Sequence, residues 1–130
     1  MTDEKLVDMA KEAMKNAYVP YSHFKVGAAL LAKDGTVFQG CNIENASYGA
    51  TNCAERTAIF KAVSEGYREF EKIAVVASSG DYASPCGICR QVLFEFLPEG
   101  KVILDSEEKG MVTYTVRELL PFGFSEADIK

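Results

Sequence analysis

The fold is decided by residues 73–89, which read IAVVASSGDYASPCGIC. This stretch opens with a compact apolar run, residues 73–77, which is typical of a buried strand. A polar loop follows, and Pro85 then favours a helix start, because proline is tolerated in the first helical turn. We therefore predict a strand, a loop and a helix that begins at Cys86 and carries Cys89 in its first turn.

A second helix is predicted to begin in a similar way, with a cysteine at its start. The triplet Cys53-Ala54-Glu55 opens a segment of helical spacing. Two strand–helix units on a shared sheet can bring the N-termini of their helices close together. We therefore expect the sulfurs of Cys53, Cys86 and Cys89 to meet around one point, with the carboxylate of Glu55 beside them.

The rest of the chain alternates between helical and strand patterns, without a linker that would divide it. The predicted helices cover 6–17, 53–65, 86–97 and 116–120, and the predicted strands cover 24–32, 36–41, 73–77, 101–104 and 111–115. Residues 42–52 are rich in Asn, Ser and Gly and are predicted to form a loop. This order predicts an α/β fold, in which helices pack on both faces of a mixed sheet. We expect residues 1–130 to form a single domain.

Composition argues against several classes of function. The chain has 130 residues, 48% of them hydrophobic, and a formal net charge of -5. Without clustered Lys or Arg, this acidic balance disfavours a nucleic acid polymer as partner. The N-terminus lacks the features of a signal peptide, and no apolar run is long enough to span a membrane. We therefore expect a cytoplasmic protein, whose four cysteines serve as metal ligands or thiols.

Three cysteines in this arrangement favour zinc. Zinc prefers tetrahedral coordination by sulfur and nitrogen, and three protein ligands leave the fourth position for water, as in catalytic sites. The N–H groups at a helix N-terminus favour thiolates over thiols. Three thiolates leave a net negative cluster, and we predict that Arg56 offsets it by donating hydrogen bonds to sulfur. We predict that Glu55 moves protons between water and substrate.

Other interpretations of these residues stay open at this point. The CxxC pair at the second helix also fits a redox dithiol. A closed structural zinc site would need a fourth ligand, for which Cys41 and His23 are the spare candidates. Glu55 in a first helical turn could serve only to complement the helix dipole. Phe122 and Phe124 fit ordinary core or interface positions as well as a substrate contact.

Four motifs together resemble the small cytidine deaminases. They read Pro20-Tyr21-Ser22-His23-Phe24-Lys25-Val26-Gly27-Ala28-Ala29, Gly40-Cys41-Asn42-Ile43-Glu44-Asn45-Ala46-Ser47-Tyr48, Cys53-Ala54-Glu55-Arg56 and Pro85-Cys86-Gly87-Ile88-Cys89-Arg90-Gln91. The resemblance runs in register over almost the whole chain, and Ile88 departs from it because many relatives carry Ala there. It implies a three-layer α/β/α fold with a five-stranded mixed sheet. It also implies one Zn²⁺ per subunit and a homotetramer with composite active sites.

The resemblance further implies roles for particular residues. It agrees with Cys53, Cys86 and Cys89 as zinc ligands, with Glu55 as the catalytic residue and with Arg56 beside the ligands. It also implies that Phe24 packs on the pyrimidine, that Asn42 and Glu44 bind the ribose, and that Ala54 lies in the substrate site. Ala46, Tyr48 and Phe124 are implied to lie near the site of a neighbouring subunit. The implied reaction is the hydrolytic deamination of cytidine and deoxycytidine to uridine and deoxyuridine, with release of ammonia, in pyrimidine salvage.

Rival functions remain for such a sequence. Blasticidin deaminases are similar around the zinc, although the segment Asn42-Ile43-Glu44-Asn45 favours a plain nucleoside substrate. Editing of a polynucleotide is disfavoured by the acidic charge. The rival from a different class is a non-catalytic zinc-binding module, and an open coordination position would separate the two.

Overall fold

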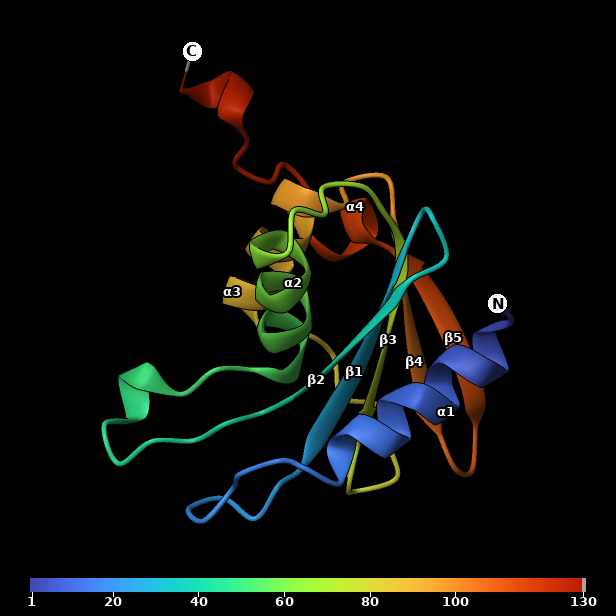
Figure 1. Ribbon diagram of the computed structural model, residues 1–130, viewed down its shortest axis with the longest axis vertical. Helices are drawn as coiled ribbons and strands as arrows, with labels where there is room; N and C mark the ends of the chain where they lie inside the picture. The colour runs from blue at the N-terminus through green and yellow to red at the C-terminus, as the bar shows by residue number, and fades with distance from the viewer. Residues whose placement is uncertain (130) are drawn as a thin grey trace.

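A five-stranded mixed sheet forms the centre of the computed structural model, which describes residues 1–129 (Figure 1). The strands lie side by side in the order β2-β1-β3-β4-β5. Their bounds are β1 Val26–Ala32, β2 Val37–Cys41, β3 Phe70–Ala77, β4 Lys101–Ser106 and β5 Gly110–Thr115. β3 and β4 run parallel, and the other neighbouring strands are antiparallel. The predicted α/β fold with a five-stranded mixed sheet is therefore confirmed.

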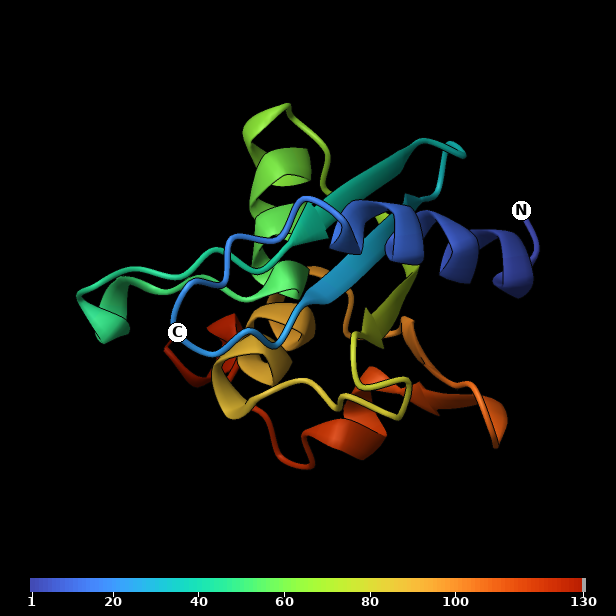
Figure 2. The same ribbon diagram turned by 90° about the horizontal axis from the view of Figure 1, so that it is seen from below.

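Helices cover both faces of this sheet, which gives three layers (Figure 2). α1 (Asp3–Met14) packs its buried side chains, such as Leu6, against Ala29 of β1 on one face. α2 (Ala54–Ser64) and α3 (Gly87–Phe96) pack against the other face, where Leu30 of β1 belongs to a larger core. Alternate residues of β1 thus point to two different cores, which explains why this central strand is apolar on both faces. A short α4 (Val116–Leu119) follows β5 directly.

α2 lies directly against β2 because Gly40 has no side chain. A Cβ atom at Gly40 would lie 2.6 Å from the carbonyl oxygen of Ala54 and 2.5 Å from the amide nitrogen of Ala58, closer than such atoms approach. Ala54 is the first residue of α2, and Cys53 precedes it. The glycine therefore sets how close the start of this helix comes to the sheet.

The predicted helix boundaries differ from the structure by small amounts that have local causes. Cys53 and Cys86 cap α2 and α3 in extended conformation, so each helix begins one residue later than expected. α1 begins at Asp3 because the hydroxyl of Thr2 accepts a hydrogen bond from an amide in the first turn. It ends at Met14, earlier than predicted, and the following segment turns toward residues 42–44.

Further differences concern strands and loops: β1 begins at Val26, later than predicted, and β4 continues to Ser106. β3 begins at Phe70, earlier than the apolar run predicts. The backbone of Lys72 pairs with both neighbouring strands, and its ammonium forms an ion pair with Asp3 of α1, so a polar residue is accommodated within the strand. Residues Tyr48–Ala50 and Glu126–Asp128 form short 3₁₀ helices where no helix was predicted. Among the described residues, none of the helices combines the length and apolar character needed to cross a membrane.

Candidate metal centre

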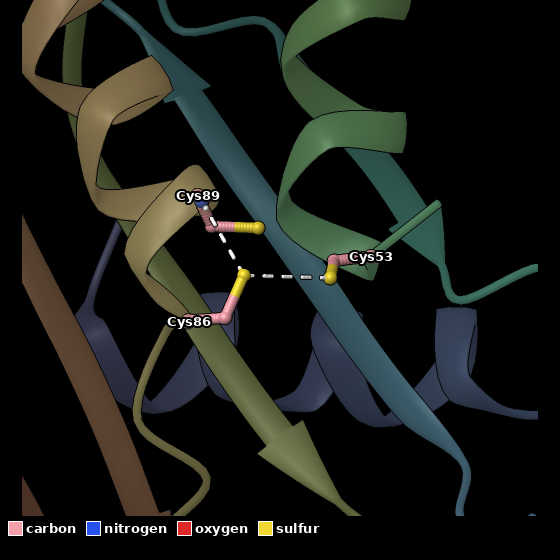
Figure 3. Close-up of side chains that lie close together, drawn as sticks. All are labelled: Cys53, Cys86 and Cys89. Carbon is pink, nitrogen blue, oxygen red and sulfur yellow. Dashed lines mark hydrogen bonds between the residues drawn. The ribbon is translucent and has the colours of Figure 1, made fainter. Parts of the chain in front are cut away.

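Three cysteine sulfurs converge between the N-termini of α2 and α3 (Figure 3). The Sγ atoms of Cys53, Cys86 and Cys89 all lie within 4.8 Å of one another. Those of Cys53 and Cys86 are 3.8 Å apart. Cys89 is buried, Cys53 is half-buried and Cys86 is exposed. Over residues 1–129, no other group of cysteine, histidine or acidic side chains is arranged to share a metal ion.

The starts of two helices place these sulfurs, with Cys89 in the first turn of α3. Cys53 and Cys86 are N-cap residues, so their side chains lie at the open ends of α2 and α3. The Sγ atom of Cys86 accepts a hydrogen bond from the backbone N–H of Cys89, at 3.4 Å. The start of α2 is held by a small β-bridge, in which Ile43 and Asn52 each donate a backbone hydrogen bond of 2.9 Å to the other.

The start of α3 is anchored by Arg90, which follows the third cysteine. Its Nε donates to the carbonyl oxygen of Pro85 at 2.8 Å, and its Nη1 donates to the carbonyl oxygen of Leu119 at 2.9 Å. Pro85 is buried and directly precedes Cys86. One guanidinium thus ties the segment that carries Cys86 to the end of α4.

Arg56 brings a positive charge to the sulfurs. Its Nη2 donates to the Sγ atom of Cys53 at 3.3 Å, which is the contact expected from the sequence. The pKa of Cys53 is lowered to about 5, most strongly by a hydrogen bond from Cys89 and further by the Arg56 guanidinium. The same hydrogen bond, together with burial, raises the pKa of Cys89. The two pKa values are therefore shifted in opposite directions by one shared hydrogen bond.

This set of donors fits zinc. In a tetrahedral site with Zn–S bonds of about 2.3 Å, two sulfurs lie about 3.8 Å apart. The separation between Cys53 and Cys86 is 3.8 Å. A divalent cation would stabilise all three thiolates and so remove their competition for a proton. Cys41 and His23 lie outside the group, so the described residues offer neither as the fourth ligand that a closed structural site needs.

Glu55 is buried in the first turn of α2, with 4% of its surface exposed. Burial raises the pKa of its carboxyl to about 7, and the neighbouring Cys53 charge acts in the same direction. A carboxyl with a pKa near neutrality can both accept and donate a proton at working pH. A carboxylate that served only the helix dipole would not need this desolvated position.

A cavity of about 230 Å³ opens beside the sulfurs, and a second one adjoins it. The first is lined by Phe24, Val26, Asn42, Thr51, Cys53, Ala54, Glu55, Ala83, Ser84 and Cys86. The second, of about 300 Å³, is lined by Tyr21, Ser22, Glu44, Tyr48 and Thr51. The structure therefore brings Phe24, Asn42 and Ala54 to the sulfurs, and it places Glu44 and Tyr48 in the neighbouring cavity.

The sequence patterns do not single out Ser22, Thr51 or Ser84 as site residues. Thr51 lines both cavities, Ser84 lines the one beside the sulfurs, and Ser22 lines the other. All three lie outside regular helices and strands. Small polar residues are common in any loop, so composition alone carries no signal that separates them from their neighbours.

Two of the predicted site residues lie away from both cavities. Ala46 is exposed in the loop after β2. Phe124 is exposed near the C-terminal end and lines a separate hollow together with Phe94 and Leu120. Its backbone carbonyl accepts a hydrogen bond of 2.7 Å from Gln91 of α3. Neither residue is brought to the sulfurs of its own chain.

Comparisons with known proteins identify this arrangement. Residues 1–105 match the family described as the cytidine and deoxycytidylate deaminase zinc-binding region. Over 130 residues the chain is 54% identical to a cytidine deaminase of Sporosarcina psychrophila, covering 99% of this chain and 96% of that protein. A cytidine deaminase of Halalkalibacterium halodurans is also 54% identical over 130 residues, covering 99% and 98%. The crystal structure of cytidine deaminase from Burkholderia pseudomallei has a TM-score of 0.91 and 50% identity, covering 95% of this chain and 100% of that one.

Replacing one buried sulfur tests the metal centre. We expect Cys89→Ala to lower the zinc content of the purified protein by roughly tenfold or more, because two ligands hold the ion far less tightly than three. Elemental analysis per chain measures this, with Cys41→Ala as the control that keeps its zinc, since Cys41 lies outside the sulfur group. Full zinc content in Cys89→Ala would refute the ligand assignment.

Proposed function

The chain belongs to the cytidine and deoxycytidylate deaminase family, whose members are hydrolases, and we propose that it converts cytidine and deoxycytidine to uridine and deoxyuridine with release of ammonia. The observation that carries this proposal is the buried carboxyl of Glu55 in the same cavity as two of the three converging sulfurs. A redox dithiol needs neither Glu55 nor Cys53, and a non-catalytic zinc module needs no cavity beside its ligands. The arrangement therefore supports a catalytic site.

We propose that Cys53, Cys86 and Cys89 hold one Zn²⁺ per subunit. When bound, the ion would supply Lewis acidity and lower the pKa of water at the site. Three thiolates weaken that Lewis acidity by their negative charge, and the hydrogen bond from Arg56 to Cys53 draws charge back from one of them. The part of Arg56 in this proposal is therefore to tune the sulfurs, without contact to the substrate.

Glu55 is proposed to carry every proton in the reaction. It takes a proton from water and passes it to N3 of the pyrimidine, while the remaining hydroxyl bonds to C4. It then takes the proton of that new hydroxyl and passes it to the amino group, so that ammonia leaves and the C4 carbonyl of uridine remains. A pKa raised to about 7 by burial suits a group that must accept and return protons in turn.

The substrate residues are proposed from their places in the two cavities. Phe24, Asn42 and Ala54 line the same cavity as Glu55. The pyrimidine would bind in this cavity, with its ring against Phe24. Glu44 lines the adjoining cavity, where its carboxylate would accept a hydrogen bond from a ribose hydroxyl, with Asn42 as its companion. An analogue that lacks this hydroxyl would leave the Glu44 carboxylate without that hydrogen bond, which gives the site a basis for selectivity.

We also propose a homotetramer in which Ala46, Tyr48 and Phe124 approach the site of a neighbouring subunit. The support is their exposure: Tyr48 is 74% and Phe124 57% exposed, and Phe122 beside the latter is fully exposed. The C-terminal segment also extends away from the rest of the molecule (Figure 1). Sedimentation of the zinc-loaded protein should give the mass of four chains, and a single-chain mass would contradict the assembly.

The broader setting of the reaction is part of the same proposal. Residues 1–130 would act as one catalytic domain in the cytoplasm, where the four cysteines, none of which forms a disulfide in the described structure, would stay reduced. The physiological role would be pyrimidine salvage. A strain that depends on cytidine for its pyrimidines should need the active protein for growth, and growth without it would argue for another role.

The central experiment is incubation with cytidine. The zinc-loaded protein should release ammonia and uridine in equal amounts, and a chelator that removes the zinc should abolish both. Deoxycytidine, tested beside cytidine, should give deoxyuridine. Zinc binding without any ammonia from either nucleoside would favour the non-catalytic module.

Glu55→Gln separates the proton carrier from the metal site. The amide has nearly the same shape but cannot accept and return protons, so we expect kcat to fall by roughly 10²–10⁴-fold. The zinc content should stay unchanged, because Glu55 is not among the converging sulfurs. Turnover at the wild-type rate would remove Glu55 from the mechanism.

A further inference from the structure

The carboxylate of Glu44 is held by three donors from one short turn. Its Oε1 accepts the backbone N–H of Tyr21 at 3.0 Å and that of Ser22 at 3.1 Å. Its Oε2 accepts the hydroxyl of Ser22. The hydrogen bond from Ser22 is also the largest influence that lowers the pKa of Glu44, so the group stays ionised and acts only as an acceptor. Ser22 therefore supplies two of the three hydrogen bonds that fix the direction of this side chain.

The same hydroxyl makes a second hydrogen bond. The Oγ atom of Ser22 accepts the backbone N–H of Phe24 at 3.0 Å while it donates to Glu44. A hydroxyl can donate once and accept from another group at the same time, so both bonds form together. One small side chain thus joins the carboxylate proposed for the sugar to the aromatic residue proposed for the base.

Phe24 is held on its other side as well. Its carbonyl oxygen accepts a hydrogen bond of 2.8 Å from Nδ2 of Asn42, whose Oδ1 accepts the N–H of Val26 at 2.9 Å. Between Ser22 and Phe24 lies His23, which has a positive φ of 59°. That conformation is costly for a residue other than glycine and persists only where its surroundings impose it. The hydrogen bonds of Ser22 and Asn42 on either side of Phe24 supply such a constraint.

We propose that Ser22 is a positioning residue for the nucleoside, whose hydroxyl sets the placement of the Glu44 carboxylate relative to the ring of Phe24. This inference rests on the proposed function, because it takes Glu44 and Phe24 as the contacts to sugar and base. Ser22 lines the cavity of Glu44, and Phe24 lines the cavity beside the sulfurs. Its effect belongs to binding rather than to proton transfer, since Glu55 and the sulfurs are held by other elements.

Ser22→Ala is the primary test. We expect KM for cytidine and the dissociation constant of uridine, measured by calorimetry, to rise by roughly 5–30-fold, because a hydrogen bond to a charged group is lost. The value of kcat should change less than about threefold, and the zinc content should not change. Ser22→Thr, which keeps the hydroxyl, should restore most of the affinity.

Ser64→Ala is the matched control. The hydroxyl of Ser64, at the end of α2, donates a hydrogen bond of 2.8 Å to the backbone carbonyl of Lys61, and Ser64 lines neither cavity. Its KM should match that of the wild type. A thermal melt of each variant shows whether the chain is folded, and the uridine titration then reports on the site of the folded protein.

A double-mutant cycle with Glu44→Ala tests whether Ser22 acts through Glu44. In the Glu44→Ala background, Ser22→Ala should weaken uridine binding much less than it does in the wild type, since one of its two partners is gone. Equal weakening in both backgrounds, or a KM for Ser22→Ala within twofold of wild type, would overturn the inference. A wild-type protein that does not deaminate cytidine would instead refute the proposed function.

Discussion

The geometry of the site depends on two helix starts that meet over one sheet. Cys53 and Cys86 lie 33 residues apart in the chain, yet their sulfurs are separated by 3.8 Å. The parallel pair β3 and β4 makes this possible, because the connection between them carries α3 to the same sheet face as α2. Because Cys53 and Cys86 are the N-cap residues and Cys89 and Glu55 lie in the first turns, two helix starts that meet bring all four side chains together.

Charge is distributed unevenly over this small volume. Burial favours the protonated form of Glu55, whereas the hydrogen bond from Cys89 and the Arg56 guanidinium favour the thiolate of Cys53. The pKa of this carboxyl is thus raised, while that of the adjacent thiol is lowered. Such opposite shifts between neighbouring groups are common where a protein performs acid–base chemistry, because ordinary surface groups have no cause for them.

Sequence patterns gave the layers, the sheet and the sulfur group, because these follow from apolar periodicity and from cysteines at helix starts. They missed the first residues of β3, since Lys72 interrupts the apolar run and finds its partner, Asp3, far away in the chain. They also gave no reason to choose Ser22 or Thr51. The roles of those residues arise from contacts between loops, such as the hydroxyl of Ser22 on the carboxylate of Glu44, and no local period encodes a contact of this kind.

Gly40 of β2 contributes to the position of the candidate metal centre, although it is not one of the site residues. It lines neither of the two cavities at the candidate metal centre, but the first turn of α2 packs on its Cα position so closely that only a hydrogen atom fits there. Any larger residue at position 40 would push the start of α2 away from the sheet. Cys53 would then move away from Cys86 and Cys89. A redesign of this sheet edge must therefore keep a glycine at the position that faces the start of the helix. The same holds for any transfer of the three ligands to another scaffold.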